Sequence, residues 1–257
     1  MNISIRDRSV HPSLDRAFEI ARNLGFDGVE LSIGGPNMPE HLIWRREGLM
    51  KMADFLQDAS VRISAAHLGS YEAFGLNRPL GQKLFQALLP RAAKLHISAL
   101  TVAIPQQTLR SAETCEEAAQ TLAARCREAA ERDFSLAVGL PLSADDSLRF
   151  LDAVDSDNLG LDYDILHAAR EGRKPEKEIR QLNERIRQLR ARDEGDDGSS
   201  CPIGMGVVRF EPIAAALNAV QFQGGFVIDA PPGGDAAASA AANLAAVQEA
   251  LLWAQSY

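Results

Sequence analysis

The sequence predicts a single (β/α)8 barrel that spans residues 1–257. Segments with strand and helix patterns alternate eight times in about 250 residues, the length typical of such a barrel. No linker or shift in composition marks a boundary between two domains. In the stretch 158–167, apolar residues alternate with small or acidic ones, as on a strand whose inner face carries polar groups.

Strand and helix patterns follow one another from the N-terminus. Residues 1–5 form the first predicted strand, and residues 14–24 form a helix because their apolar side chains recur at helical spacing. Ser13 can cap this helix and Gly25 ends it. The remaining strands are predicted at residues 29–33, 61–67, 100–104, 136–140, within 158–167, at 186–192 and at 226–230. The remaining helices are predicted at residues 41–57, 81–96, 113–132, 147–154, 175–184, 211–220 and 237–254.

A doubly wound open sheet is the structural alternative, since it uses the same alternation of strands and helices. The chain has no Gly-x-Gly-x-x-Gly motif after its first strand, which such a sheet would use to bind a dinucleotide. We therefore prefer the closed barrel.

The composition favours a small molecule as the main partner. The formal net charge is -8, so neither nucleic acid nor an anionic membrane surface would be attracted without a strong local basic patch. Nowhere do about 18 apolar residues run together, and no basic start precedes an apolar leader. We expect a cytoplasmic protein that binds neither nucleic acid nor membrane.

The three cysteines predict neither a disulfide nor a zinc motif. Cys115 and Cys126 fall on one predicted helix about 16 Å apart, which is too far for a disulfide. Cys201 lies in a predicted loop. We expect three reduced thiols.

Strand alternation predicts which side chains point into the barrel. The large apolar residues of each strand should face the helices, so the alternate positions should face the interior. The inward set includes Ser4, Arg6, Glu30, Ser32, Thr101, Gly139, Asp162, Asp164, Gln188, Arg190, Arg192 and Asp229, with His67 at the end of the third strand and His167 in the loop after the sixth. Charges inside a barrel must pair, bind a metal or meet a charged ligand.

The chain resembles the xylose isomerase-like TIM barrel superfamily. Five stretches in the same order carry the resemblance: AFEIARNLGFDGVEL (17–31), LGLDYDILHA (159–168), RIRQLRARD (185–193), PIGMGVVRF (202–210) and GGFVID (224–229). The resemblance implies a sugar or sugar-phosphate isomerase or epimerase. An enzyme of the endonuclease IV type, another member, needs several metals that the ligands present here could not hold.

Epimerases of this superfamily hold one divalent ion with a Glu on strand five, an Asp on strand six, a His on strand seven and a Glu on strand eight. By resemblance these positions fall on Gly139, Asp164, Arg190 and Asp229. One ligand is kept, one is shortened and two are lost, so the resemblance implies a degenerate metal site. The Asp-x-x-His histidine, a substrate contact in these relatives, is His167.

We hypothesise that Arg190 stands where the metal would sit, with its guanidinium held by Asp164 and Asp229. Arginine pairs with carboxylates and stays charged, so it would neutralise the leftover acids without a metal. The alternative is that Arg190 reaches the rim and is solvated. Glu30 has two interpretations as well: a family-like site residue, or the partner of an inward arginine such as Arg6.

Two functions follow from these residues. The first is a sugar or sugar-phosphate isomerase- or epimerase-like protein that acts on a small polyol or keto acid, with catalytic candidates Asp164, Asp229 and His167 and substrate-binding candidates His67, Glu30, Arg190 and Arg192. The second is a non-catalytic or repurposed relative that binds a small anionic ligand through Arg190 and Arg192. We expect no cofactor; a divalent cation (Mn, Mg or Zn) would use the residual ligands Asp164 and Asp229. Relatives with this barrel often associate, which leaves a homo-oligomer open.

Overall fold

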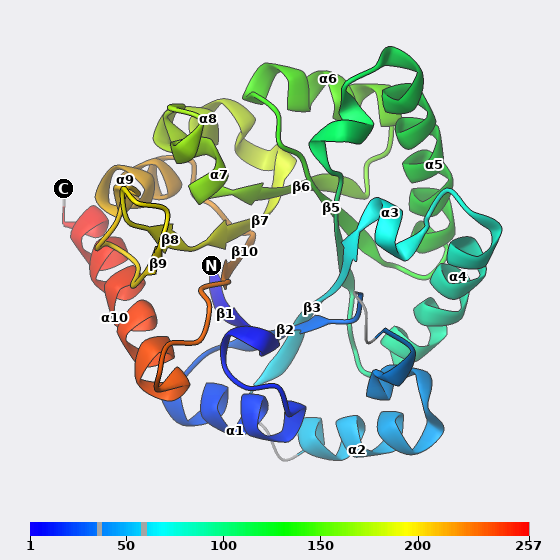
Figure 1. Cartoon of the computed structure of the whole chain (residues 1–257), viewed down its shortest axis with the longest axis horizontal. Helices are drawn as coiled ribbons and strands as arrows, with labels where there is room; N and C mark the ends of the chain where they lie inside the picture. The colour runs from blue at the N-terminus through cyan, green and yellow to red at the C-terminus, as the bar shows by residue number, and fades with distance from the viewer. Residues whose placement is uncertain (35–37, 58–60, 257) are drawn as a thin grey trace. The chain divides into compact units, whose positions relative to one another are not determined.

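Eight strands form a closed barrel in the computed structural model, in the order β1, β10, β7, β6, β5, β4, β3, β2 (Figure 1). The structure describes residues 1–34, 38–57 and 61–256. The barrel strands are β1 (Asn2–Arg6), β2 (Gly28–Ser32), β3 (Arg62–Ser70), β4 (Ala99–Ala103), β5 (Ser135–Gly139), β6 (Leu159–Asp164), β7 (Ile186–Ala191) and β10 (Gly225–Ile228). The predicted (β/α)8 barrel is confirmed, and each strand lies within a few residues of its predicted position.

Helices follow the strands along the chain, as predicted. They are α1 (Leu14–Leu24), α2 (Arg46–Gln57), α3 (Tyr71–Phe74), α4 (Pro79–Lys94), α5 (Ala112–Ala130), α6 (Ala144–Val154), α7 (Ile165–Arg170), α8 (Pro175–Leu182), α9 (Phe210–Ala219) and α10 (Ala236–Gln255). Short 3-10 turns are η1 (Asp7–Ser9), η2 (Met38–Glu40), η3 (Leu42–Trp44), η4 (Gln106–Leu109) and η5 (Asn183–Arg185). Gly25 ends α1 in the left-handed conformation, with φ of 84°, because glycine adopts it without steric cost.

The chain divides into two compact units, which we describe separately. The first unit contains residues 1–29 and 163–257, and the second contains residues 30–162. In the first unit, β10 pairs in parallel with β1 and with β7, so that Val227 lies opposite both Ser4 and Arg190. Helices α8, α9 and α10 lie outside these strands (Figure 1).

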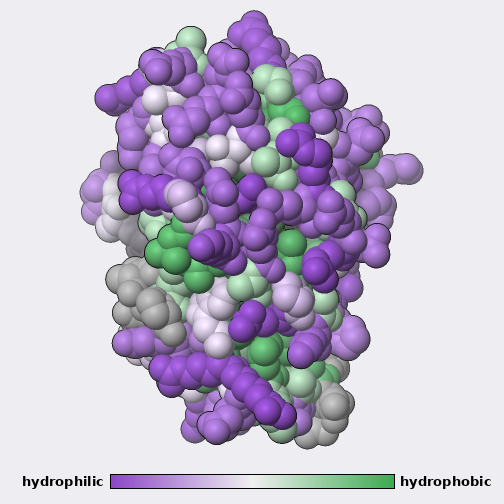
Figure 2. Space-filling view, turned by 90° about the vertical axis from the view of Figure 1, so that its right-hand side faces the viewer, coloured by the Kyte–Doolittle hydropathy of each residue, from purple (hydrophilic) through white to green (hydrophobic). Residues whose placement is uncertain are grey.

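In the second unit, β3, β4, β5 and β6 pair in parallel, with α5 and α6 outside them (Figure 1). Thr101 on β4 lies opposite His67 on β3 and Ala137 on β5. The face of the molecule at α4 and α5 is mostly hydrophilic, with apolar residues in small separate groups (Figure 2).

Both faces of the barrel strands are buried, as in other barrels of parallel strands. On β2, Leu31 and Glu30 are both fully buried, and on β7, Leu189 and Arg190 are both buried. Alternate strand positions therefore put polar and charged groups out of contact with bulk water. Such groups are stable only when they are hydrogen-bonded or paired, and the partners they find define the candidate site.

A short hairpin follows β7, in the region where Cys201 was predicted to lie in a loop. β8 (Asp193–Glu194) pairs antiparallel with β9 (Ser200–Cys201). The three cysteines are free, as predicted. Among the described residues, no helix combines the length and apolar character needed to cross a membrane.

Candidate functional site

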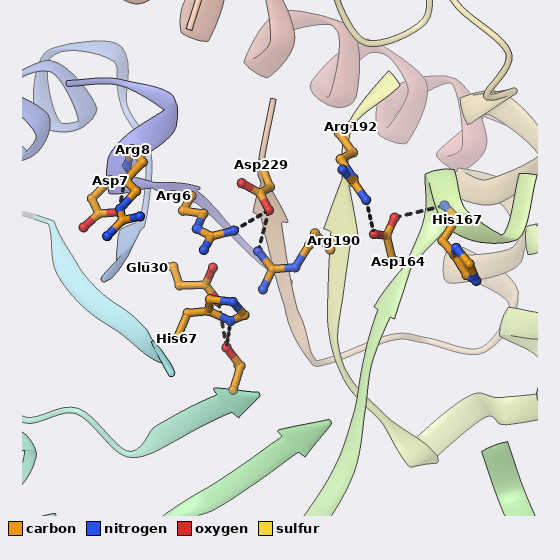
Figure 3. Close-up of polar contacts among 11 residues, drawn as sticks. Arg6, Asp7, Arg8, Glu30, His67, Asp164, His167, Arg190, Arg192 and Asp229 are labelled. Carbon is orange, nitrogen blue, oxygen red and sulfur yellow. Dashed lines mark hydrogen bonds and ion pairs between the residues drawn. The ribbon is translucent and has the colours of Figure 1, made fainter. Parts of the chain in front are cut away.

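Asp229 joins two arginines in the first unit. It directly follows β10, and its Oδ2 accepts hydrogen bonds from Arg6 Nη1 at 2.8 Å and Arg190 Nη1 at 2.9 Å (Figure 3). Arg6 ends β1 and Arg190 lies on β7, the two strands on either side of β10. The side chains of Arg6, Asp229 and Arg190 are 20%, 17% and 8% exposed. Little water is left to compete, which makes these charge-assisted bonds strong for their kind.

Asp164 connects the end of β6 to Arg192 and to helix α7. Its Oδ2 accepts from Arg192 Nη2 at 2.7 Å, and its Oδ1 accepts from the backbone N–H of His167 at 3.1 Å (Figure 3). Asp164 is the N-cap of α7, and aspartate is favoured there because its carboxylate satisfies an otherwise unpaired backbone donor. Helix capping is therefore a sufficient structural reason for the Asp-x-x-His spacing.

Two sequence expectations need correction here. His167 lies in the first turn of α7, not in a loop, and Asp164 contacts its backbone N–H. Asp164 was also expected to hold Arg190, but its two oxygens bind Arg192 and His167. The hypothesis was right that Arg190 pairs with Asp229.

A partly buried ion pair supports the strand that carries Asp164. Tyr163 donates its hydroxyl to Glu178 Oε2 on α8 at 2.7 Å, and Arg173 Nη1 lies 2.9 Å from the same oxygen. Burial, followed by the hydrogen bond to the Glu178 carboxylate, raises the pKa of Tyr163 well above its usual value. The phenol therefore stays protonated and donates to Glu178, which ties β6 to α8.

Three buried side chains are connected in the second unit. His67 Nδ1 lies 2.8 Å from Thr101 Oγ1, and the Thr101 hydroxyl donates to Glu30 Oε1 at 3.3 Å (Figure 3). Glu30 and His67 were predicted as site residues, and both are buried. The sequence placed Thr101 inside the barrel but gave it no role, because its contact depends on the pairing of β3 with β4.

Asp193 organises the segment after β7, a role that the sequence did not indicate. Its carboxylate is almost completely buried and accepts four backbone N–H groups, from Glu194, Gly204, Gly206 and Val208, at 2.9–3.1 Å. A Cβ on Gly206 would collide with the Glu194 carbonyl and the Asp193 carboxylate, so only glycine fits there. An aspartate directly after a strand, followed by a glycine-rich stretch, is the signal that could have predicted this arrangement.

The side chains present do not suit a divalent ion. Asp164 and Asp229 each already bind a guanidinium, and Arg190 brings a positive charge. Gly139, at the end of β5, has no donor side chain. Among the residues that the structure describes, no group of three or more His, Cys, Asp or Glu side chains is arranged to hold a metal.

The chain belongs to the xylose isomerase-like TIM barrel family, whose model matches residues 18–256. A search of curated proteins finds no match.

Solved structures share the fold over almost the whole chain. An L-ribulose 3-epimerase has a TM-score of 0.81 at 17% identity, covering 99% of this chain and 96% of its own. D-Psicose 3-epimerase from Clostridium cellulolyticum H10, solved with D-tagatose, has a TM-score of 0.80 at 15% identity, covering 98% and 99%. An IolI protein with a bound zinc atom has a TM-score of 0.81 at 16% identity, covering 98% of each chain. At these identities the similarity shows the fold alone.

Proposed function

We propose that this protein is a sugar isomerase- or epimerase-like member of its family that acts on a small polyol or keto acid without a divalent metal ion. In this proposal residues 1–257 form one barrel domain, and arginine–carboxylate pairs replace the family's metal site. The family match supports the reaction class, as do structural neighbours that are named as 3-epimerases.

The observation that carries the proposal is the double contact of Asp229 Oδ2 with Arg6 and Arg190. A divalent ion bound by Asp229 would sit near the Arg190 guanidinium. At about 4 Å and an effective dielectric constant near 20, a divalent ion and a guanidinium repel by roughly 8 kcal/mol. Mg²⁺ and Mn²⁺ also prefer several carboxylate or imidazole donors, and Gly139 and Arg190 supply none.

In the absence of a metal, Arg190 and Arg192 would bind the substrate. A guanidinium offers planar paired N–H donors to the oxygens of a carboxylate, phosphate or enediolate. Asp164 and Asp229 act mainly by holding Arg192 and Arg190 in place, rather than as bases. His167 remains a candidate substrate contact on the first turn of α7.

Turnover of a panel of keto- and aldo-sugars, measured with Mn²⁺ and with a chelator, tests the proposal. We expect epimerisation or isomerisation whose rate is unchanged by the chelator. Turnover that depends on added metal would contradict the replacement of the metal site.

A repurposed relative that binds a small anion through Arg190 and Arg192 is the second candidate. The environment of Arg192 favours this second candidate. The Arg192 side chain is 38% exposed, and its buried Nε has no hydrogen-bond partner. The Arg192 guanidinium can donate hydrogen bonds to an anionic ligand while its Nη2 stays bonded to Asp164. Calorimetric binding of a sugar acid or sugar phosphate, with no turnover of any sugar, would favour this candidate over the first.

A further inference from the structure

A cavity of about 820 Å³ lies between α5 and α6, the helices outside β4 and β5 in the second unit (Figure 1). Its lining residues all fall between 109 and 153, so the cavity belongs to that unit alone. Most of the lining is apolar, and its most buried members are Ala119 and Phe150, each 4% exposed. A mostly apolar cavity of roughly 300–1,000 Å³ with a few polar groups is typical of a small-molecule site.

Small side chains explain why the two helices leave this space. Ala112 and Ala119 on α5 and Ala153 on α6 line the cavity, and each contributes only a methyl group. Larger side chains at these positions would occupy the volume, since protein interiors otherwise pack closely. The half-buried thiol of Cys115 lines it too, and burial raises the pKa of this thiol, so it is a neutral and weakly polar part of the lining.

Exposed charged residues border the apolar part of the cavity. Asp146 is already paired, because its Oδ1 accepts a hydrogen bond from Arg149 Nη1 at 2.7 Å. Glu116 Oε1 accepts a hydrogen bond from the neutral amide of Gln120 at 3.1 Å. The carboxylate of Glu116 therefore keeps its full charge beside the cavity, and its second oxygen can bind a ligand.

The segments that line the cavity carry an excess of negative charge. Residues 109–124 and 142–154 contain six aspartates and glutamates but only two arginines. The N-terminus of each helix adds about half a positive charge, which is too little to remove the excess. A cation is therefore attracted to this cavity and an anion is repelled.

We propose that the cavity between α5 and α6 binds a small apolar molecule that carries one positive charge, such as an arylalkylamine. Its apolar part contacts Ala119 and Phe150, and its ammonium group lies beside Glu116. Burial of apolar surface supplies most of the affinity, and the charge mainly supplies selectivity, because an exposed ion pair contributes little. This site does not depend on the proposed function, and it takes ligands of the opposite charge from those proposed for Arg192.

Fluorescence titration with two matched probes tests the preference for a cation. Anthracenylmethylamine and anthracenecarboxylate, both substituted on the central ring, share one ring system but carry opposite charges at about pH 7. We expect the amine to bind about fivefold or more tightly than the carboxylate. In Glu116→Gln the amine should bind about threefold more weakly, while the carboxylate should bind no more weakly than before. Equal affinity for the two probes, or no binding of the amine, would overturn the proposal.

Alkylation of the unchanged protein by N-ethylmaleimide, followed for each cysteine by mass spectrometry, locates the bound amine. Saturating amine should slow the alkylation of Cys115 several-fold, because this thiol lines the cavity. Cys201 is also half-buried but does not line the cavity, so its rate should stay the same. If the amine binds and the rate at Cys115 is unchanged, or if both thiols slow equally, the amine binds elsewhere and the proposal fails.

Filling the cavity provides a second, independent check. Ala153→Phe places a ring in the cavity and should weaken binding of the amine about tenfold or more. Ala130→Phe is the matched control, since Ala130 is an exposed alanine on α5 that does not line the cavity. Undiminished binding in a folded Ala153→Phe protein, with folding verified by circular dichroism, would contradict the proposal. Failure of the sugar assays has no bearing on any of these results.

Discussion

Replacing Asp229 by asparagine should destabilise the protein far more than the same replacement in an exposed ion pair. Asp229 Oδ2 accepts from both Arg6 and Arg190, and each charge-assisted bond contributes about 1.5–3 kcal/mol. Asparagine keeps one neutral oxygen acceptor, and the side chains retain 8–20% exposure. We therefore expect a loss of about 2–3 kcal/mol, which corresponds to a melting temperature lower by roughly 5–10 °C.

The assay is thermal unfolding followed by circular dichroism, with Asp146→Asn as the matched control. Asp146 pairs with Arg149 at 2.7 Å, but these side chains are 50% and 77% exposed. Exposed pairs contribute little, so the control should shift the melting temperature by less than about 2 °C. If Asp229→Asn shifts the melting temperature no more than the control does, then Asp229 does not hold the two arginines in place.

Three further predictions concern other parts of the chain. Arg192→Met should weaken the binding of a sugar acid about tenfold or more, as measured by calorimetry. The free energy of unfolding should change little, because the pair that Arg192 forms with Asp164 is partly exposed. An unchanged affinity would show that Arg192 is not part of the site. Burial raises the pKa of Cys126 from 9.0 to about 11, so the unfolded chain releases this proton first and stability falls between these pH values. Urea unfolding at several pH values should show this fall, and the curve should be flatter for Cys126→Ala; equal curves would contradict the shift. Gly206→Ala should lower the unfolding free energy by about 1–3 kcal/mol, because a Cβ at this position has no room. At Gly139 a Cβ would have its nearest contacts at 3.6 Å, so Gly139→Ala should change the unfolding free energy by less than about 0.5 kcal/mol. Urea denaturation compares the two variants, and equal losses would refute the steric argument.

The elements and the inward-facing positions could be predicted because they depend on local periodicity. Helical and strand spacing within one segment already indicates which face is apolar, and burial of both faces of β2 and β7 agrees with that pattern. Asp164 and Asp229 could also be predicted as site candidates from their positions alone, since each is an acidic residue at the end of a strand.

The pairing of arginines with aspartates could not be predicted in the same way. Arg190 and Arg192 point to the same side of the chain about 6.7 Å apart, and a flexible arginine can span that difference. From the sequence alone, each of the two arginines could pair with Asp164 or with Asp229. The structure assigns Arg192 to Asp164, whose other oxygen caps α7, and Arg190 to Asp229.

The role of Thr101 depends on contacts between distant parts of the chain. Alternation places its side chain inside the barrel, but only the pairing of β3 with β4 puts it beside His67. A threonine on a strand is ordinary, so no local signal distinguished this one.

Equilibrium dialysis of the purified protein against Mn²⁺, with bound metal counted per chain, tests the central claim most directly. The central claim is that arginine–carboxylate pairs have replaced the family's metal site. If that is so, the purified protein retains well under one ion per chain. One Mn²⁺ per chain in the unchanged protein, lost on Asp164→Asn, would contradict it.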